Sequence, residues 1–360
     1  MENVKCTLRA KSQIQKFQIP VGWLFGSRLM SYFSSMNKIN WGIIGCGDVT
    51  EVKSGPAFNK VPDSSLVAVM RRDAAKARDY AQRHAVPKWY SNAQDLINDP
   101  GVNAIYIATP PSSHEEYALA AVAAGKPVYV EKPMSVDAGS AWRMHAAASD
   151  KGVPLVVAHY RRAQPLFKKL KQLLLDRVIG DTRFVRLELY KPLLTDNELA
   201  VPKTAWRVDP GVAGGGLFHD LAPHQLDLMY HFFGPVAKAS GIGTNQAGKY
   251  GASDIVTGNI LFKNNIIFDG LWNFSAGTAT EKDQCEIIGT KGSIGFSMFD
   301  HMPVVVRLDT NEQSFAFDRL EHVQQPMIEQ VVRYFLGKGD NPCGGEEGAE
   351  VMQLLDRFTS

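Results

Sequence analysis

The chain has 360 residues, a formal net charge of +2 and 45% hydrophobic residues. This length favours two domains, and the composition is typical of a globular protein with large buried cores. The small net charge provides no strong field for nucleic acid or for an acidic membrane surface. No apolar stretch is long enough to span a membrane. We therefore expect neither nucleic acid nor a membrane as a partner.

Two features of the chain bear on its location. The cysteines Cys6, Cys46, Cys285 and Cys343 form no CxxC pair, so neither a zinc site nor a disulfide framework is expected. Free thiols fit a reducing compartment, and we expect a cytoplasmic protein. Residues 1–37 are basic and lack periodicity. They are interpreted as a disordered tail, a targeting peptide or, as the favoured reading, sequence upstream of a true start at Met36.

Strand and helix patterns alternate over residues 38–160. Short valine- and isoleucine-rich runs are typical of buried parallel strands, and capped or alanine-rich segments between them indicate helices. This alternation predicts an α/β domain with a doubly wound parallel sheet of the Rossmann type. The expected strands are 39–45, 66–70, 104–109, 128–130 and 153–158, and the expected helices are 73–84, 114–124 and 138–149.

The pattern changes over residues 161–360. One amphipathic helix is followed by β-rich runs with short turns, and the last stretch is helical again. This order predicts an α+β substrate domain with an antiparallel or mixed sheet. The expected strands are 184–190, 255–262, 266–274, 285–288, 293–299 and 304–308, and the expected helices are 165–178, 324–336 and 346–357.

A glycine turn, Gly45-Cys46-Gly47, follows the first strand. Such a turn lets backbone N–H groups approach a pyrophosphate, so we assign it, with Asp48 and Val49, to cofactor binding. Thr50 replaces the small third residue of the usual pattern, and Pro56 suggests that the helix begins late. The alternative is an ordinary strand-to-helix turn, but the flanking βαβ units favour a dinucleotide site. Cys46 is interpreted as a packing residue, with a redox role as the lesser alternative.

Two arginines, Arg71 and Arg72, end the second strand. An NAD-binding chain would carry an acidic residue here to hold the ribose hydroxyl. Guanidinium groups instead suit the 2′-phosphate of NADP, although both side chains could simply be solvated. Asp73 is expected to cap the following helix. We therefore predict NADP as the cofactor, with NAD as the alternative.

Further cofactor contacts are expected at the carboxyl ends of the later strands, where doubly wound sheets bind ligands. Thr109, Pro110 and His114 follow the strand that ends at residue 109, and Glu131 and Lys132 follow the strand 128–130. The Lys132 ammonium could hydrogen-bond a substrate oxygen and stabilise charge during hydride transfer, whereas the alternative is an ordinary surface lysine. The peptide bond from Lys132 to the proline after it is a candidate cis bond.

Asp220 and His224 are four residues apart, which makes their side chains neighbours on a helix. A carboxylate beside a histidine orients it and raises its basicity, so the pair could move a proton. In the structural alternative, Pro223 occupies the first helical turn, Asp220 caps the helix and His224 belongs to the core. The spacing matches no metal site, and no metal is expected.

The motifs occur together in one order. They are Gly42-x-x-Gly45-x-Gly47, Ala108-Thr-Pro-Pro111 with His114, Val130-Glu-Lys-Pro133, Trp206-Arg207, and Gly214-Gly-Gly-x-x-x-Asp220-x-x-x-His224-x-x-Asp227. In this combination the chain resembles the Gfo/Idh/MocA oxidoreductase family over about residues 38–358. The resemblance implies a Rossmann domain followed by an α+β domain whose large, open, mostly antiparallel sheet often forms dimer or tetramer contacts. A homodimer or homotetramer is therefore expected.

The resemblance also implies roles for single residues. Lys132 matches the catalytic lysine of the family, and Asp220 and His224 match its aspartate and histidine, with His224 as the acid/base. Four residues match positions on the substrate side of the cleft, namely Tyr160, Arg161, Trp206 and Arg207. The implied reaction is hydride transfer between NADP(H) and a sugar, polyol, anhydro-sugar or dihydrodiol. Trp272 and the loop 192–204 are candidates for setting specificity.

Two other functions compete with this one. A glycosidase could hold NAD tightly and oxidise its sugar only transiently, but Arg71 and Arg72 argue against NAD. A non-catalytic dinucleotide sensor could regulate a partner, but such a protein has no need of Lys132, Asp220 and His224. Exchange of bound nicotinamide with added NADPH would distinguish a dehydrogenase from the glycosidase.

Overall fold

The computed structural model describes residues 36–360, and it contains a six-stranded and an eight-stranded sheet. The interpretations of the N-terminal extension concern residues 1–37, of which residues 1–35, with Cys6, lie outside this range. None of the helices within it has the length and apolar character needed to cross a membrane.

The first sheet is wholly parallel, with strands in the order β3-β2-β1-β4-β5-β6. This is the strand order of dinucleotide-binding domains, so the predicted Rossmann-type sheet is confirmed. Its strands are β1 (Ile39–Ile44), β2 (Ser64–Met70), β3 (Lys88–Tyr90), β4 (Ala104–Ile107), β5 (Val128–Val130) and β6 (Leu155–Val157). Its helices are α2 (Asp48–Val52), η1 (Gly55–Asn59), α3 (Ala74–Arg83), α4 (Ala93–Asn98), η2 (Pro111–Ser113), α5 (His114–Ala123) and α6 (Ala138–Lys151).

The strand β3 and the helix α4 were not expected. β3 is a three-residue edge strand with largely exposed side chains, so it lacks the apolar run that marked the other strands. α4 has only six residues, too few for a clear period.

The second sheet has eight strands in the order β14-β13-β12-β11-β7-β10-β9-β8, and only β7 and β10 are paired in parallel. The expected mostly antiparallel sheet is therefore confirmed. Its strands are β7 (Thr182–Pro192), β8 (Val236–Thr244), β9 (Ile255–Phe262), β10 (Ile267–Ala276), β11 (Lys282–Gly289), β12 (Gly292–Phe296), β13 (Val304–Leu308) and β14 (Glu312–Phe315). The edge strand β8 escaped sequence analysis because small residues dilute its apolar alternation.

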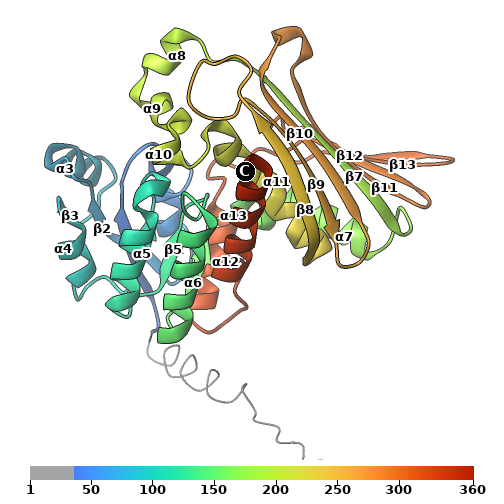
Figure 1. Ribbon diagram of the computed structural model, residues 1–360. Helices are drawn as coiled ribbons and strands as arrows, with labels where there is room; N and C mark the ends of the chain where they lie inside the picture. Colours follow the sequence, from blue (N-terminus) through green and yellow to red (C-terminus); the bar gives the residue numbers. More distant parts are fainter. Residues whose placement is uncertain (1–35) are drawn as a thin grey trace, which may run out of the picture.

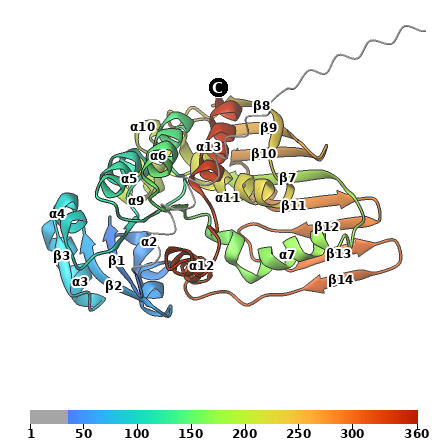
Figure 2. The ribbon, with the colours of Figure 1, turned by 90° about the horizontal axis from the view of Figure 1, so that it is seen from below.

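Two long helices, α7 (Pro165–Leu175) and α11 (Gly216–Phe233), pack on one face of this sheet (Figures 1 and 2). Phe167 of α7 lies 6.3 Å from Phe296, and Phe218 of α11 lies 5.1 Å from Trp272 between ring centroids. On the opposite face the side chains are more exposed, and Ile267 retains 48% of its accessible surface. Oligomer formation through the sheet stays a prediction.

Several short helices lead from β6 and β7 toward α11. They are η3 (Tyr160–Ala163), α8 (Asp196–Ala200), α9 (Pro202–Ala205), η4 (Trp206–Val208) and α10 (Pro210–Ala213). In Figure 1, α8, α9 and α10 lie above the first sheet, on the side from which α11 enters. This arrangement carries the second half of the chain over the carboxyl edge of the first sheet.

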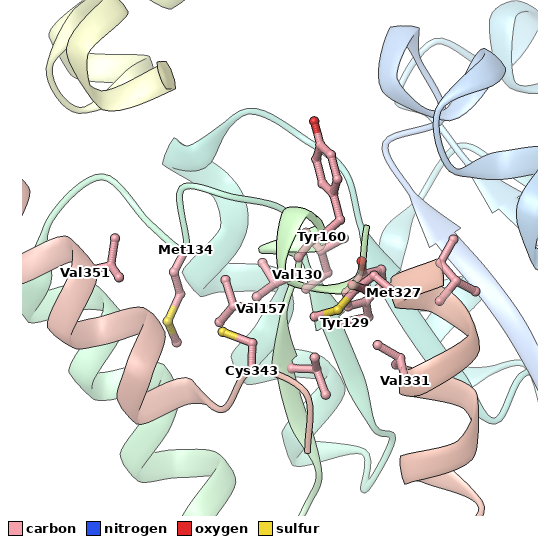
Figure 3. Packing of buried hydrophobic residues seen from close by; sticks show 14 of the residues in the cluster. Tyr129, Val130, Met134, Val157, Tyr160, Met327, Val331, Cys343 and Val351 are labelled. Carbon is pink, nitrogen blue, oxygen red and sulfur yellow. The ribbon is translucent and has the colours of Figure 1, made fainter. Parts of the chain in front are cut away.

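The last two helices, α12 (Gln325–Phe335) and α13 (Gly345–Thr359), return to the first sheet (Figure 2). Trp41 of β1 lies 5.7 Å from Phe335 of α12, between ring centroids. Figure 3 shows side chains of both helices packed around β5 and β6, with the Tyr160 hydroxyl directed away from this core. The proposed division at residue 160 stays a prediction, since these helices join the two parts.

Candidate active site

The glycine turn brings the end of β1 against the residue after β4. Gly45 has a φ of +93°, and a Cβ there would lie 2.6 Å from the Thr109 Cγ2 atom. Only glycine avoids both the strain and the clash. The backbone of the turn is therefore held close to Thr109, at the edge where doubly wound sheets bind their ligands.

The helix after the turn begins at Asp48, so the expected late start near Pro56 is wrong. Thr50 explains the early start, because its hydroxyl accepts a hydrogen bond from the Gly47 N–H at 3.0 Å and donates one to the Gly47 carbonyl at 2.8 Å. Asp48 and Val49 then supply first-turn N–H groups, which have no partner within a helix. Thr50, the larger third residue of the motif, thus preserves the glycine turn because its hydroxyl bonds to the backbone of Gly47.

Cys46 is fully buried within the turn. Burial raises the pKa of its thiol to about 11, so the residue is a neutral thiol at physiological pH. A neutral, buried thiol is a poor nucleophile, which supports the packing interpretation. Any contact of Cys46 with a cofactor would therefore be made by its backbone.

The basic corner at the end of β2 adjoins the turn. Arg71 donates from Nη1 to the Cys46 carbonyl at 3.3 Å, while Arg72 is exposed. Asp73 accepts a hydrogen bond from the Lys76 N–H at 3.1 Å, which confirms its expected capping role. The corner thus offers a guanidinium beside the glycine turn, and its nearest carboxylate is engaged elsewhere.

His114 lies beneath the cleft rather than in it. The side chain is fully buried, with Nε2 2.7 Å from the Thr109 carbonyl and Nδ1 3.1 Å from the Pro133 carbonyl. Both ring nitrogens face the backbone, so the side chain braces two loops, and a cofactor contact by His114 stays a prediction. It ties the loop after β4 to the loop after β5, with Pro110 as part of the same rigid turn.

Glu131 is likewise buried below the cleft. One carboxylate oxygen accepts hydrogen bonds from the Tyr106 hydroxyl and the Gln324 amide, both at 2.5 Å, and the other accepts from the Lys132 N–H at 3.1 Å. A carboxylate saturated in this way has a structural role, and a cofactor contact by Glu131 stays a prediction. The network fixes the backbone from which the Lys132 side chain rises.

Lys132 reaches across to the helix α11. Its ammonium donates to a carboxylate oxygen of Asp220 at 2.8 Å and to the Asp220 carbonyl at 2.9 Å. These two bonds leave the third donor of the ammonium for a ligand. The peptide bond between Lys132 and Pro133 is cis, as predicted. The lysine is therefore a partly buried, oriented cation, not a surface lysine.

The helix α11 begins earlier than the sequence suggested. Gly214 has a φ of +90°, and a Cβ there would lie 2.5 Å from the Val136 carbonyl oxygen, so the chain before the helix passes close to the loop after β5. Pro223 lies inside the helix, and Asp220 is one turn into it. The alternative in which Asp220 is the N-cap is therefore wrong.

His224 lies near Lys132 but is not held by Asp220. Its ring is 5.2 Å from the Tyr160 ring and 5.9 Å from the Phe299 ring, and its buried Nδ1 has no hydrogen-bond partner among residues 36–360. Asp220 instead bonds to Lys132 and, at 3.2 Å, to Arg207 Nε. The expectation that Asp220 orients His224 is therefore wrong, and the Tyr160 and Phe299 rings hold the imidazole instead.

The electrostatics of the site give the side chains of His224, Lys132 and Asp220 different charges. Burial, and then the cations of Lys132 and Arg161, hold the pKa of His224 well below 6.5, so the imidazole is neutral at pH 7. For Lys132, burial would lower the pKa, but the Asp220 carboxylate outweighs it and the pKa is raised. For Asp220, burial would raise the pKa, but Lys132 and Arg207 outweigh it and the pKa is lowered. A neutral base thus adjoins an ion pair.

The four substrate-side candidates lie around this cluster. Tyr160 faces His224, and Arg161 lies over the Phe299 ring at 4.7 Å. Arg207 lies 4.7 Å from the centroid of the Trp206 ring and pairs with Asp220. Trp272 is different, because it is fully buried and donates to Gln225 at 2.6 Å, so it is a core residue and not a specificity determinant.

Sequence reasoning missed several residues of the site. Gln324 lies 193 positions from Glu131, and Phe299 lies in a loop with no motif, so no local signal could have identified them. Lys53 lowers the pKa of both Asp220 and His224, though less than nearer groups. Lys203 forms a 2.6 Å ion pair with Asp48 across the glycine turn. These contacts depend on the tertiary fold.

Known proteins resemble the chain over most of its length. A protein of Formosa agariphila named as an oxidoreductase is 46% identical over 89% of this chain and 98% of its own. Trans-1,2-dihydrobenzene-1,2-diol dehydrogenase of Macaca fascicularis is 31% identical over 71% of this chain and 73% of its own. A levoglucosan dehydrogenase solved with NADH and L-sorbose has a TM-score of 0.81 over 89% of this chain and 96% of its own. At 20% identity, that likeness shows the fold.

Two family descriptions match successive parts of the chain. Residues 39–159 match "Oxidoreductase family, NAD-binding Rossmann fold", and residues 167–295 match "GFO/IDH/MocA C-terminal domain". The first range contains all strands of the first sheet and the second contains most strands of the second sheet, and the lysine, aspartate and histidine of the cluster are drawn from both. The chain therefore belongs to the Gfo/Idh/MocA family of oxidoreductases.

Proposed function

We propose that this protein transfers a hydride between NADP(H) and a hydroxyl-bearing carbon of a carbohydrate-like substrate. The observation that carries the proposal is a protonated lysine and a neutral histidine gathered at the carboxyl edge of the first sheet. In the oxidative direction the C–H bond gives its hydride to carbon 4 of the nicotinamide ring, and the O–H bond gives its proton to a base. The product is a carbonyl compound.

Lys132 would bind the reacting oxygen. Two of its donors are already fixed on Asp220, so the direction of the third is restricted. As the proton leaves the hydroxyl, negative charge develops on oxygen, and a nearby preorganised ammonium stabilises it. Asp220 keeps the ammonium protonated and oriented, and therefore acts on the reaction through Lys132.

His224 would take the proton. An imidazole that is neutral at pH 7 can accept a proton from the hydroxyl, and in the reductive direction its protonated form returns one. The Tyr160 and Phe299 rings fix the plane of the imidazole without engaging its nitrogens. Because the pKa of His224 is low, solvent does not protonate the imidazole before the substrate binds.

The cofactor would occupy the turn that runs from Gly45 to Val49, with Thr109 at its side. NADP is favoured over NAD because Arg71 lies beside the turn and Asp73 is committed to its capping bond. A guanidinium can bind a 2′-phosphate through two parallel hydrogen bonds. If this assignment is correct, Arg71→Asp lowers the NADPH/NADH affinity ratio at least about tenfold, equivalent to one bidentate contact of ~1.4 kcal/mol. An unchanged ratio would contradict it.

A carbohydrate-like substrate is favoured by the polar character of the cluster and by two relatives. One is named a dihydrodiol dehydrogenase, and the other a levoglucosan dehydrogenase solved with L-sorbose. Both names describe compounds with neighbouring hydroxyl-bearing carbons. Lys132, Arg207 and the aromatic Trp206 give this chain donors and a flat surface for such a compound.

The test uses Lys132→Ala and His224→Ala in the full chain. Each should lower kcat by about 100- to 1,000-fold, because each removes a group that acts in the transition state. NADPH affinity should change less than about threefold, since the cofactor turn is intact. Lys168→Ala, which removes an exposed lysine from α7, is the matched control. Near-normal kcat in both site variants would contradict the proposal.

A further inference from the structure

A cavity of about 320 Å³ adjoins the catalytic cluster. It lies between η3, the start of α7 and the segment 297–323. Tyr160 and Phe299 form part of its wall, and the same two rings contact the His224 ring at 5.2 Å and 5.9 Å. The volume is within the range of small-ligand sites, about 300–1,000 Å³. A compound in this cavity would therefore extend toward His224.

Two adjacent arginines differ sharply in their partners. Arg162 is buried and fully paired, with Asp227 oxygens 2.6–3.0 Å from Nη2 and Nε and a Glu347 oxygen 2.8 Å from Nη1. Arg161 lines the cavity and has no carboxylate within ion-pair distance among residues 36–360. Its Nη1 donates to the Met298 carbonyl at 2.6 Å, and its buried Nε has no hydrogen-bond partner.

The surroundings of Arg161 hold the guanidinium without neutralising it. The Phe299 ring lies 4.7 Å from it, and the Tyr160 and Phe167 rings lie at 5.8 Å. Burial lowers the pKa of Arg161, while Tyr160 and Asp283 partly oppose that shift. The carboxylate of Asp283 itself accepts three backbone N–H bonds at 2.5–3.0 Å. Arg161 is partly buried, with a buried Nε, and a desolvated cation without a counter-ion is costly, so a ligand anion would offset part of that cost.

The other charged residues that line the cavity do not act as counter-ions for Arg161. Asp318 and Arg319 line it but are exposed, so water screens both. The remaining lining is aromatic, aliphatic or neutral and polar, apart from His301, whose Nε2 faces the Phe317 carbonyl at 2.7 Å. The interior of the cavity thus carries one uncompensated positive group on aromatic walls.

We propose that the substrate carries a carboxylate which binds Arg161 in this cavity while its reacting hydroxyl lies at Lys132 and His224. This inference rests on the proposed hydride transfer and narrows its substrate class to sugar acids. The guanidinium presents two parallel donors that match a carboxylate, and the aromatic walls suit the ring faces of a sugar. Binding would also place a negative charge near His224 and so favour its protonated form during oxidation.

The test compares sugars that differ only in this group. Candidate pairs are D-glucuronate with D-glucose and D-galacturonate with D-galactose, in which a carboxylate replaces the carbon-6 hydroxymethyl. With NADP⁺, kcat/KM for the preferred acid should exceed that of its neutral partner by about 100-fold, on the scale of a desolvated charge-assisted contact. D-Gluconate with D-glucose extends the comparison to a carboxylate at carbon 1.

Variants then assign the effect to one side chain. Arg161→Leu should lower kcat/KM for the acid about 100-fold more than kcat/KM for the neutral sugar, with the extra loss mainly in KM. Arg161→Lys should retain part of the preference, because the charge remains while the bidentate geometry is lost. Arg183→Leu is the control, since it removes an arginine that is 65% exposed on β7. Melting temperatures check that Arg161→Leu and a second variant, Arg161→Met, are folded.

The two proposals fail separately. If neutral sugars and acids are oxidised equally well, or if Arg161→Leu slows both equally, the carboxylate inference is overturned and hydride transfer stands. If no sugar reacts, calorimetry on the NADP⁺-loaded protein decides, because equal affinity for D-glucuronate and D-glucose overturns the inference. Turnover that is insensitive to Lys132→Ala and His224→Ala overturns the proposed function itself.

Discussion

The helix α11 carries two acidic residues seven positions apart, and each meets a cation from the first half of the chain. Asp227 and Arg162 are 1% and 3% exposed, and hydrogen bonds saturate the pair. Asp220 and Lys132 are 19% and 13% exposed, and the lysine keeps a donor free. The same helix thus bears one ion pair suited to holding the fold and another suited to binding a ligand. Burial and spare donors, rather than charge, distinguish the two.

The largest expected effect comes from breaking the buried pair. Asp227→Ala leaves Arg162 charged and buried, which should lower the free energy of unfolding by about 3–5 kcal/mol. Denaturant unfolding at pH 7 measures the loss. Asp220→Ala is the matched variant on the same helix and should cost less than half as much, because its partner is closer to water. Equal losses of unfolding free energy in the two variants would contradict the distinction between a structural and a ligand-binding ion pair.

The second effect concerns activity. Asp220→Asn keeps the shape of the side chain but removes the charge that orients the Lys132 ammonium and raises its pKa. We expect kcat to fall about 100-fold, as for loss of a preorganised electrostatic contact, with a melting-temperature change of a few degrees at most. Rates with NADP⁺ and a turned-over sugar provide the measurement. A variant that loses stability but keeps kcat would assign Asp220 to the fold alone.

The third effect is the pH dependence of catalysis. The pKa of His224 lies below 6.5, and the neutral form that accepts a proton is present above that pKa. In the oxidative direction, the acid limb of the kcat/KM profile should therefore lie below pH 6.5, and His224→Ala should abolish that limb. An acid limb at or above pH 7 would show that another group, or a differently placed histidine, takes the proton.

The fourth effect concerns stability at low pH. His159 is buried beside the Asp227 pair, and burial lowers its pKa from 6.5 to about 4. Between these values the unfolded chain binds the additional proton, so stability falls as the pH falls from 6.5 toward 4. The slope should reach about 1.4 kcal/mol per pH unit from this histidine. His159→Gln should flatten it, and an unchanged slope would assign the loss to other groups.

Some parts of the site could be predicted from local sequence patterns, and others could not. Local patterns identified Lys132 at a strand end and placed Asp220 and His224 on one helix, because strand edges and helical spacing are local properties. They did not predict that the Asp220 side chain would turn from His224 to Lys132, 88 positions away. A helix brings residues four positions apart close together, but the Asp220 carboxylate bonds to the charged Lys132 ammonium and not to the neutral His224 imidazole.

The fold likewise has local features that the sequence predicts and tertiary features that it does not. Valine-rich runs predicted the parallel sheet, since buried strands require them, whereas β3 and β8 lacked that signal. His114 and Glu131 were assigned to the cofactor because they follow strands, yet both turn inward and brace the loops that Thr109 and Lys132 occupy. Sequence position indicates which edge of the sheet a residue reaches. It does not indicate whether the side chain points into the cleft or beneath it.

The most direct test of hydride transfer is to follow the hydride itself. The purified protein would be incubated with NADP⁺ and a panel of ring-deuterated sugars and sugar acids, and the nicotinamide product examined by NMR. Hydride transfer should place deuterium at carbon 4 of the reduced ring, with formation of a carbonyl product and loss of the label in Lys132→Ala. Substrate conversion without any label in the nicotinamide, or glycoside cleavage without net NADPH, would contradict it.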